Sequence, residues 1–167
     1  FFGICLGQRD LWNPNEPSYG RATVEMYERG DWLIPRINGQ VFAEKPILYY
    51  WIALAASHFH GAVDEFSLRV PTALAAVVSV LLTYLLVLPY AGRRRALLAA
   101  ALFATQFQVF WAARAIQMDV LVLATTLGAL VPLTRMLDFE MSPRRAWTYA
   151  GVASGLGFAA KGPVALV

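Results

Sequence analysis

Two polar segments near the start of the chain carry side chains that could perform chemistry. The segment LWNPNEPSYGRA, residues 11–22, contains Glu16 and Tyr19, and the segment FAEKPILYYW, residues 42–51, contains Lys45. A carboxylate can take a proton from a hydroxyl, while lysine and tyrosine can donate hydrogen bonds to an anionic group. The two segments therefore offer a proton acceptor together with hydrogen-bond donors.

Three further ionisable residues lie beside or within apolar stretches: Arg69, Asp119 and Lys161. Lys161 falls well inside the last stretch, and a charge at such depth costs at least about 2.5 kcal/mol on insertion scales. It therefore needs a partner, either a carboxylate such as Asp119 or a lipid phosphate, unless it snorkels to the nearby surface. Arg69 either faces a phosphate or anchors a helix end, and Asp119 is either a site residue or a partner of a helix dipole.

The composition indicates an all-α polytopic membrane protein. Hydrophobic residues make up 58% of the chain and charged residues only 15%, which is more apolar than soluble domains usually are. The net charge is +3, but no basic run is interleaved with aromatic residues. We therefore expect membrane contact and no nucleic-acid partner.

The apolar stretches predict how the chain crosses the bilayer. A spanning helix needs roughly 20 apolar residues, and four stretches approach or reach this length: 70–91, 96–113, 120–137 and 147–167. Residues 1–7 are expected to end an earlier span, with residues 8–69 forming an outer loop. Residues 1–167 are thus expected to be the N-terminal part of a single transmembrane domain.

Arginine on the short connections predicts the orientation. Connections 92–95 and 138–146 carry Arg93, Arg94 and Arg95, and Arg144 and Arg145. An excess of arginine on short loops marks the cytoplasmic side. The outer loop 8–69 and Asp119 should therefore share the opposite side.

The outer loop itself is expected to contain two short interfacial helices. Pro17 to Arg29 has an N-terminal proline and a following glycine, which are typical helix boundaries. Asn38 and Gly39 predict a turn, and a second helix, too short to span, is expected from Pro46 to about Gly61.

The motifs occur in an order that resembles a known family. They are LWNPNE, SYGRA, GDWLIP, EKPILYYW, RVP, MD and KGP. This order is similar to that of the GT-C membrane glycosyltransferases, nearest to the aminoarabinose transferases that modify lipid A and more distantly to the protein O-mannosyltransferases. The resemblance implies an inverting transfer of a sugar from a polyprenyl-phosphate donor to a lipid A-like or protein acceptor, on the outer face of the bacterial cytoplasmic membrane.

One departure from the family pattern affects the catalytic carboxylate. The family normally has an aspartate where this chain has Asn15, and an amide cannot accept the proton. Either Glu16 acts as the base, or Asn15 only orients the acceptor while another carboxylate acts, or the protein is an impaired relative. Asn15 would also serve as a helix N-cap. Ser18 likewise replaces a family arginine, so one phosphate contact is missing.

The remaining motif residues are expected to bind substrate. The resemblance implies that Tyr19 and Lys45 contact the carrier phosphate, while Glu44 holds Lys45, contacts the sugar or ligates a divalent cation. Asp119, Lys161 and Arg69 match the family's MD, KGP and RVP motifs. The contrasting class is a non-catalytic membrane protein that binds or transports polyprenyl phosphate and has lost the base.

Overall fold

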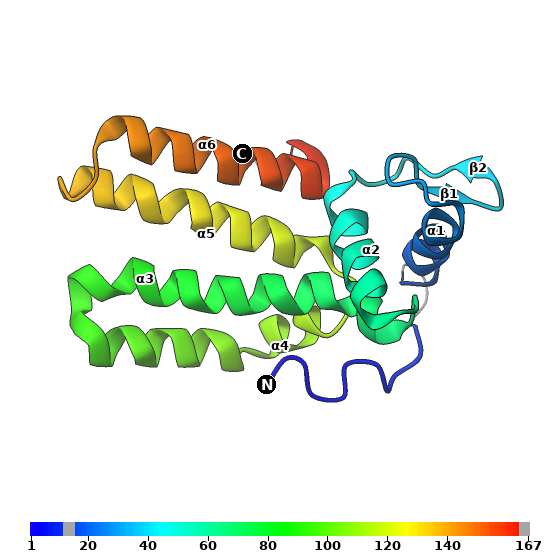
Figure 1. Cartoon of the computed structure of the whole chain (residues 1–167). Coiled ribbons are helices and arrows are strands. Elements are labelled where there is room, and N and C mark those ends of the chain that lie inside the picture. Colours follow the sequence, from blue (N-terminus) through cyan, green and yellow to red (C-terminus); the bar gives the residue numbers. More distant parts are fainter. Residues whose placement is uncertain (12–15, 164–167) are drawn as a thin grey trace.

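A computed structural model describes residues 1–11 and 16–163. Its described residues form a bundle of long helices with a smaller cap of short elements at one end (Figure 1). In chain order the elements are α1 (Glu16–Arg29), β1 (Arg36–Ile37), β2 (Gln40–Val41), α2 (Leu48–His60), α3 (Glu65–Thr105), α4 (Phe107–Ala113), α5 (Met118–Leu137) and α6 (Pro143–Lys161).

Helix α3 reverses its direction within its length. Gly92 has φ +74° and ψ 168°, a conformation that glycine adopts without the steric cost of a Cβ atom. Residues 65–91 and 93–105 therefore form two antiparallel arms joined at the arginine-rich connection (Figure 1). The predicted reversal at 92–95 is confirmed.

The predicted helix over 96–113 is interrupted, which the sequence analysis did not anticipate. α3 ends at Thr105, Gln106 is extended with φ −60° and ψ 131°, and α4 then begins. The Thr105 hydroxyl donates back to the carbonyl oxygens of Ala101 and Leu102, at 3.0 and 3.1 Å. Such bonds compete with the helical ladder and favour bending.

Two of the described helices, α3 and α5, are long and apolar enough to cross a membrane. Helix α5, at Met118–Leu137, follows the predicted stretch 120–137 closely. Helix α6 begins at Pro143 and ends at Lys161, and residues 164–167 of the last predicted stretch lie outside the described part.

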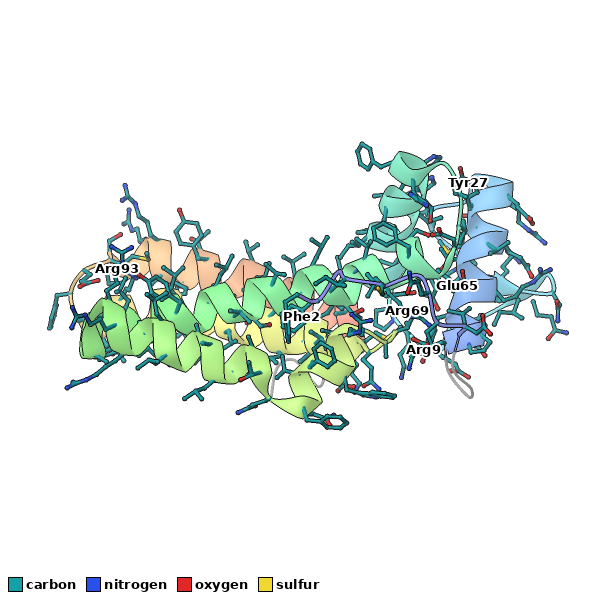
Figure 2. The ribbon with its side chains drawn as sticks, turned by 90° about the horizontal axis from the view of Figure 1, so that it is seen from below. Phe2, Arg9, Tyr27, Glu65, Arg69 and Arg93 are labelled. Atoms are coloured by element: carbon teal, nitrogen blue, oxygen red, sulfur yellow. The ribbon has the colours of Figure 1, made fainter. Side chains whose placement is uncertain are left out.

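The arginine-rich connections and the short outer elements lie at opposite ends of the bundle. Figure 2 shows Arg93 at one end and Arg69, Glu65 and Tyr27 at the other. Figure 1 shows the α5–α6 connection at the same end as the turn of α3. The described part of the outer loop 8–69 and the start of α5 at Asp119, which were predicted to share one side, therefore lie at the same end of the molecule.

The cap is built by packing α1 onto α2. Tyr19, Ala22 and Met26 of α1 are buried, as their helical spacing predicts. The Tyr19 ring meets that of Tyr49 on α2, with centroids 6.1 Å apart. Burial of this apolar face fixes the position of the motif segment that contains Tyr19.

The first residues of the chain differ from the expected helical end of a span. Residues 2–9 form turns and bends rather than a helix. Phe2 and Leu6 are nevertheless buried, so this segment packs against the bundle. Its membership of an earlier span stays a prediction.

Candidate functional site

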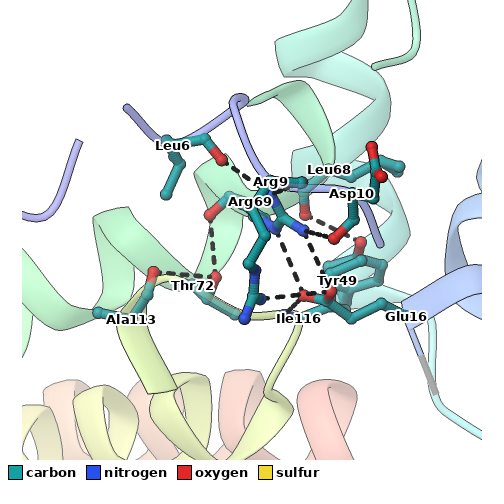
Figure 3. A network of polar contacts seen from close by, with 10 residues as sticks. All are labelled: Leu6, Arg9, Asp10, Glu16, Tyr49, Leu68, Arg69, Thr72, Ala113 and Ile116. Atoms are coloured by element: carbon teal, nitrogen blue, oxygen red, sulfur yellow. Dashed lines mark hydrogen bonds and ion pairs between the residues drawn. The ribbon is translucent and has the colours of Figure 1, made fainter. Parts of the chain in front are cut away.

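A buried arginine forms the centre of a polar network at the capped end (Figure 3). Arg69 has an exposed fraction of 0%. Its Nη1 donates to the carbonyl oxygens of Leu6 and Arg9, at 2.9 and 2.6 Å. Its Nη2 donates to the Asp10 carbonyl oxygen at 3.0 Å and to Oε2 of Glu16 at 3.1 Å, and its Nε donates to Oε1 of Glu16 at 3.4 Å.

These contacts occupy the full donor capacity of the guanidinium group. An arginine side chain carries five N–H donors, and residues of the described chain accept all five. In this conformation Arg69 has no donor left for a phosphate oxygen. Of the two roles considered from the sequence, the geometry supports anchoring.

The carboxylate of Glu16 is equally occupied. Its exposed fraction is 4%. Oε1 also accepts from the Ile116 backbone N–H at 2.7 Å, and Oε2 lies 3.5 Å from Nη2 of Arg9. With the two bonds from Arg69, four donors meet a group that has about four lone-pair sites. To act as a base, Glu16 would have to exchange one of these partners, so its catalytic role stays a prediction. Asn15 lies outside the described residues.

Local structure explains why Arg69 reaches this position. Asp64 caps α3 by accepting from the Ser67 N–H at 2.8 Å, and the Ser67 hydroxyl in turn accepts from the Asp64 N–H at 2.9 Å. This capping box fixes the first turn of α3. The Tyr49 hydroxyl then ties α2 to the Leu68 carbonyl oxygen at 2.9 Å, next to Arg69.

A second polar centre lies in a cavity of about 540 Å³ at the same end. Its wall combines the EKP motif with the hairpin region and the end of α6. The lining residues are Leu33, Ile34, Pro35, Val41, Ala43, Glu44, Lys45, Pro46, Ile47, Lys161, Gly162 and Pro163. The EKP and KGP motifs, which are far apart in sequence, therefore meet in one cavity that carries two lysines and one carboxylate.

Lys161 has a carboxylate partner, which is one of the alternatives considered for this charge within an apolar stretch. Its Nζ contacts Oδ1 of Asp119, which lies in the first turn of α5. The Asp119 side chain remains 64% exposed, so the pair is accessible. Within the described residues, by contrast, no ion pair joins Glu44 to Lys45.

Tyr19 lies between the two polar centres. Its ring contacts Phe42 just before the EKP motif, with centroids 6.1 Å apart. Burial and then the nearby negative charge of Glu44 raise the pKa of Tyr19 above its ordinary value. Its hydroxyl therefore remains protonated near neutral pH and able to donate.

Sequence reasoning missed one residue that shapes the cavity wall. Glu25 is buried on α1, and its carboxylate accepts from the backbone N–H groups of Asn38 at 2.6 Å and Gly39 at 3.2 Å. Asn38 and Gly39 both have positive φ and form the tight turn between β1 and β2. The only signal for Glu25 was a carboxylate one turn from Arg21 and Arg29, which is common on surface helices.

This contact leads to a prediction of pH dependence. The Asn38 amide bond, together with the Gly39 amide and Arg21 and Arg29, holds the pKa of Glu25 below its ordinary value. The stabilisation is thus complete above the ordinary pKa and is lost as pH falls through the lower, folded pKa. Hydrogen-exchange protection factors of the Asn38 and Gly39 amides should stay constant at neutral pH and fall below about pH 4.

Glu25→Gln should lower this protection at neutral pH and remove its pH dependence. Glu28→Gln provides the matched control, because Glu28 is exposed on the same helix. Equal protection in the wild type and Glu25→Gln would show that the carboxylate does not hold the turn.

The described residues contain no group of three His, Cys, Asp or Glu side chains that could hold a metal ion. Glu44, the ligand suggested for a divalent cation, has no second carboxylate beside it in the cavity lining.

Comparison with known proteins identifies the family. Residues 6–167 match the dolichyl-phosphate-mannose-protein mannosyltransferase family. The chain belongs to this mannosyltransferase family. Among its relatives, a Pectobacterium atrosepticum protein named undecaprenyl phosphate-alpha-4-amino-4-deoxy-L-arabinose arabinosyl transferase is 32% identical over 166 residues, covering 98% of this chain and 30% of the relative. An Aeromonas hydrophila protein of the same name is 31% identical over 169 residues, covering 99% of the chain and 31% of the relative.

Solved structures show the same fold. The crystal structure of ArnT from Cupriavidus metallidurans in the apo state matches with a TM-score of 0.92 at 21% identity, over 99% of this chain and 31% of that one. The structure of that ArnT bound to undecaprenyl phosphate matches with a TM-score of 0.76 at 25% identity and the same coverage. The expected fold, an all-α polytopic N-terminal part of a GT-C fold, is confirmed. The protein is an integral membrane protein. It spans about 30% of the length of the curated relatives it matches.

Proposed function

We propose that the protein is a glycosyltransferase that moves a sugar from a polyprenyl-phosphate donor to a lipid A-like or protein acceptor. We further propose that the reaction occurs on the outer face of the bacterial cytoplasmic membrane. The chain would supply the N-terminal part of the transmembrane enzyme. The family membership and the names of the relatives support this proposal.

The observation that carries the proposal is the cavity shared by Lys45 and Lys161. Lysine is a point charge with three donors, which suits a phosphate whose charge increases as the sugar departs. The elements whose residues line the cavity, namely the hairpin region, the segment before α2 and the end of α6, lie at the end of the bundle away from the arginine-rich connections (Figure 1). That end faces the outside if arginine marks the cytoplasmic side.

The chemistry then follows from these groups. The acceptor hydroxyl attacks the anomeric carbon, its proton passes to a base, and the bond from that carbon to the phosphate oxygen breaks with the electron pair left on the phosphate. Lys45 and Lys161 stabilise this charge, so the leaving group needs little help from an acid. Tyr19, which stays protonated, is a further donor beside the cavity. Asp119 holds Lys161 in position until the phosphate binds.

A transfer assay on the full-length protein tests the proposal. Release of sugar from undecaprenyl-phosphate aminoarabinose is measured for the wild type, Glu16→Gln and Asn15→Asp. Turnover by the wild type is expected. If Glu16→Gln abolishes turnover while the protein remains folded, Glu16 is the base. If only Asn15→Asp is active, the chain is a degenerate relative and the enzyme proposal is wrong.

One observation favours the alternative of a non-catalytic polyprenyl-phosphate-binding or transport protein. Glu16, the carboxylate next to Asn15, is already occupied by Arg69, Arg9 and Ile116. Under this alternative the wild type binds undecaprenyl phosphate but releases no sugar. Binding and turnover, measured on the same preparation, therefore separate the two functions.

A further inference from the structure

One buried tyrosine hydroxyl at the cap has no hydrogen-bond partner among residues 1–11 and 16–163. Tyr50 on α2 has an exposed fraction of 0%, and its Oη forms no hydrogen bond with the described chain. A buried hydroxyl left unpaired carries a desolvation cost that most buried polar groups avoid. Such a group calls for a ligand or an ordered water.

The adjacent tyrosine shows what a structural hydroxyl does in the same place. Tyr49 is equally buried, and its hydroxyl donates to the Leu68 carbonyl oxygen at 2.9 Å. The two rings touch, with centroids 5.4 Å apart. Tyr49 and Tyr50 are therefore equally buried, and they differ in whether the hydroxyl has a hydrogen-bond partner in the described chain.

The surroundings of Tyr50 indicate the direction from which a ligand would come. Tyr50 lies in the first turn of α2, one helical turn after the cavity-lining residue Ile47. Burial, followed by electrostatic interactions with Tyr19 and the Glu44 carboxylate, raises the pKa of Tyr50, so its hydroxyl stays protonated and able to donate. Glu44, which lines the cavity, contributes to this rise in the pKa of Tyr50.

We propose that the Tyr50 hydroxyl is a sugar-binding group of the donor site, which shares one sugar hydroxyl with Glu44. A sugar hydroxyl can accept from Tyr50 and donate to the Glu44 carboxylate at the same time. A phosphate there would be repelled by Glu44, and Lys45 and Lys161 suit it better. Because Oη is covered in this structure, the sugar reaches it only when the chain around Tyr50 moves. The inference rests on the proposed glycosyltransferase function.

The test compares Tyr50→Phe with Tyr49→Phe in the full-length protein. Without ligand, Tyr50→Phe should shift the apparent melting temperature upward, because it removes an unpaired buried hydroxyl, whereas Tyr49→Phe should shift it downward. Tyr50→Phe should bind undecaprenyl phosphate as the wild type does. It should bind undecaprenyl-phosphate aminoarabinose about tenfold more weakly, as expected for one lost hydrogen bond.

Four results would overturn the inference. A melting temperature lowered by Tyr50→Phe would show that the hydroxyl has a structural partner such as a bound water. If Tyr50→Phe weakened the binding of undecaprenyl phosphate and of undecaprenyl-phosphate aminoarabinose equally, the hydroxyl would contact the phosphate. If the affinity for both lipids were unchanged, the hydroxyl would not belong to the donor site. If the wild type binds neither lipid, the proposed function fails and the inference falls with it. If the wild type binds both and Tyr50→Phe behaves identically, only the inference fails.

Discussion

Replacement of Arg69 by methionine is expected to lower the free energy of unfolding by about 3–5 kcal/mol, the range for breaking a buried ion pair by removing one partner. The change leaves Glu16 charged and buried, and it removes the donors to the carbonyl oxygens of Leu6, Arg9 and Asp10. Residues 6–10, helix α1 and helix α3 lose their common anchor. Thermal unfolding of the purified full-length protein, followed in detergent, measures the effect.

Two further variants make this prediction specific. Arg21→Met removes an arginine from the partly exposed pair with Glu25 and should cost less than about 1 kcal/mol. Glu16→Gln combined with Arg69→Met should recover part of the lost stability, because no unpaired charge remains. If Arg69→Met kept wild-type stability and lost only phosphate binding, Arg69 would be a substrate residue and the anchoring role would be wrong.

Replacement of Lys45 by glutamine is expected to lower the rate of sugar transfer on the order of 10²-fold, the usual cost of removing one donor to a developing negative charge. Lys45 is partly exposed in the cavity, and no ion pair within the described chain holds it. Its loss should therefore leave the fold intact. The transfer rate and the melting temperature should be measured on the same preparation.

Lys45→Arg is the matched control for the charge. It keeps a positive group at the cavity and should retain much more activity than Lys45→Gln. A Lys45→Gln enzyme that turns over at the wild-type rate would exclude Lys45 from the reaction. Equal loss in both variants would indicate that the shape of the side chain matters more than its charge.

Local sequence signals predicted much of the fold. Pro17 and Gly30 marked α1, Asn38 and Gly39 marked the hairpin turn, and Gly61 marked the end of α2. These features depend on neighbouring residues and backbone conformation, so one sequence suffices to find them. The pairing of Lys161 with Asp119 was also predictable, because a charge in an apolar stretch has few possible partners.

The polar network around Arg69 could not be predicted in the same way. Three of its acceptors are backbone carbonyl oxygens of residues 6–10, and no side-chain pattern marks them. The bond from Ile116 to Glu16 joins residues that are distant in sequence. Likewise, no local pattern marks the full burial of Tyr49 and Tyr50, and the Tyr49 ring packs against Tyr19 of α1. These features follow from tertiary packing.

Binding of undecaprenyl phosphate to the full-length protein in nanodiscs tests the central claim most directly, namely that Lys45 and Lys161 form the phosphate site. The account predicts that Lys45→Gln and Lys161→Gln each weaken binding by about tenfold or more, with folding intact. Arg94→Gln, a control at the opposite end of the bundle where Arg94 is exposed, should bind as the wild type does. Wild-type affinity in both lysine variants, or an equal loss in Arg94→Gln, would contradict the account.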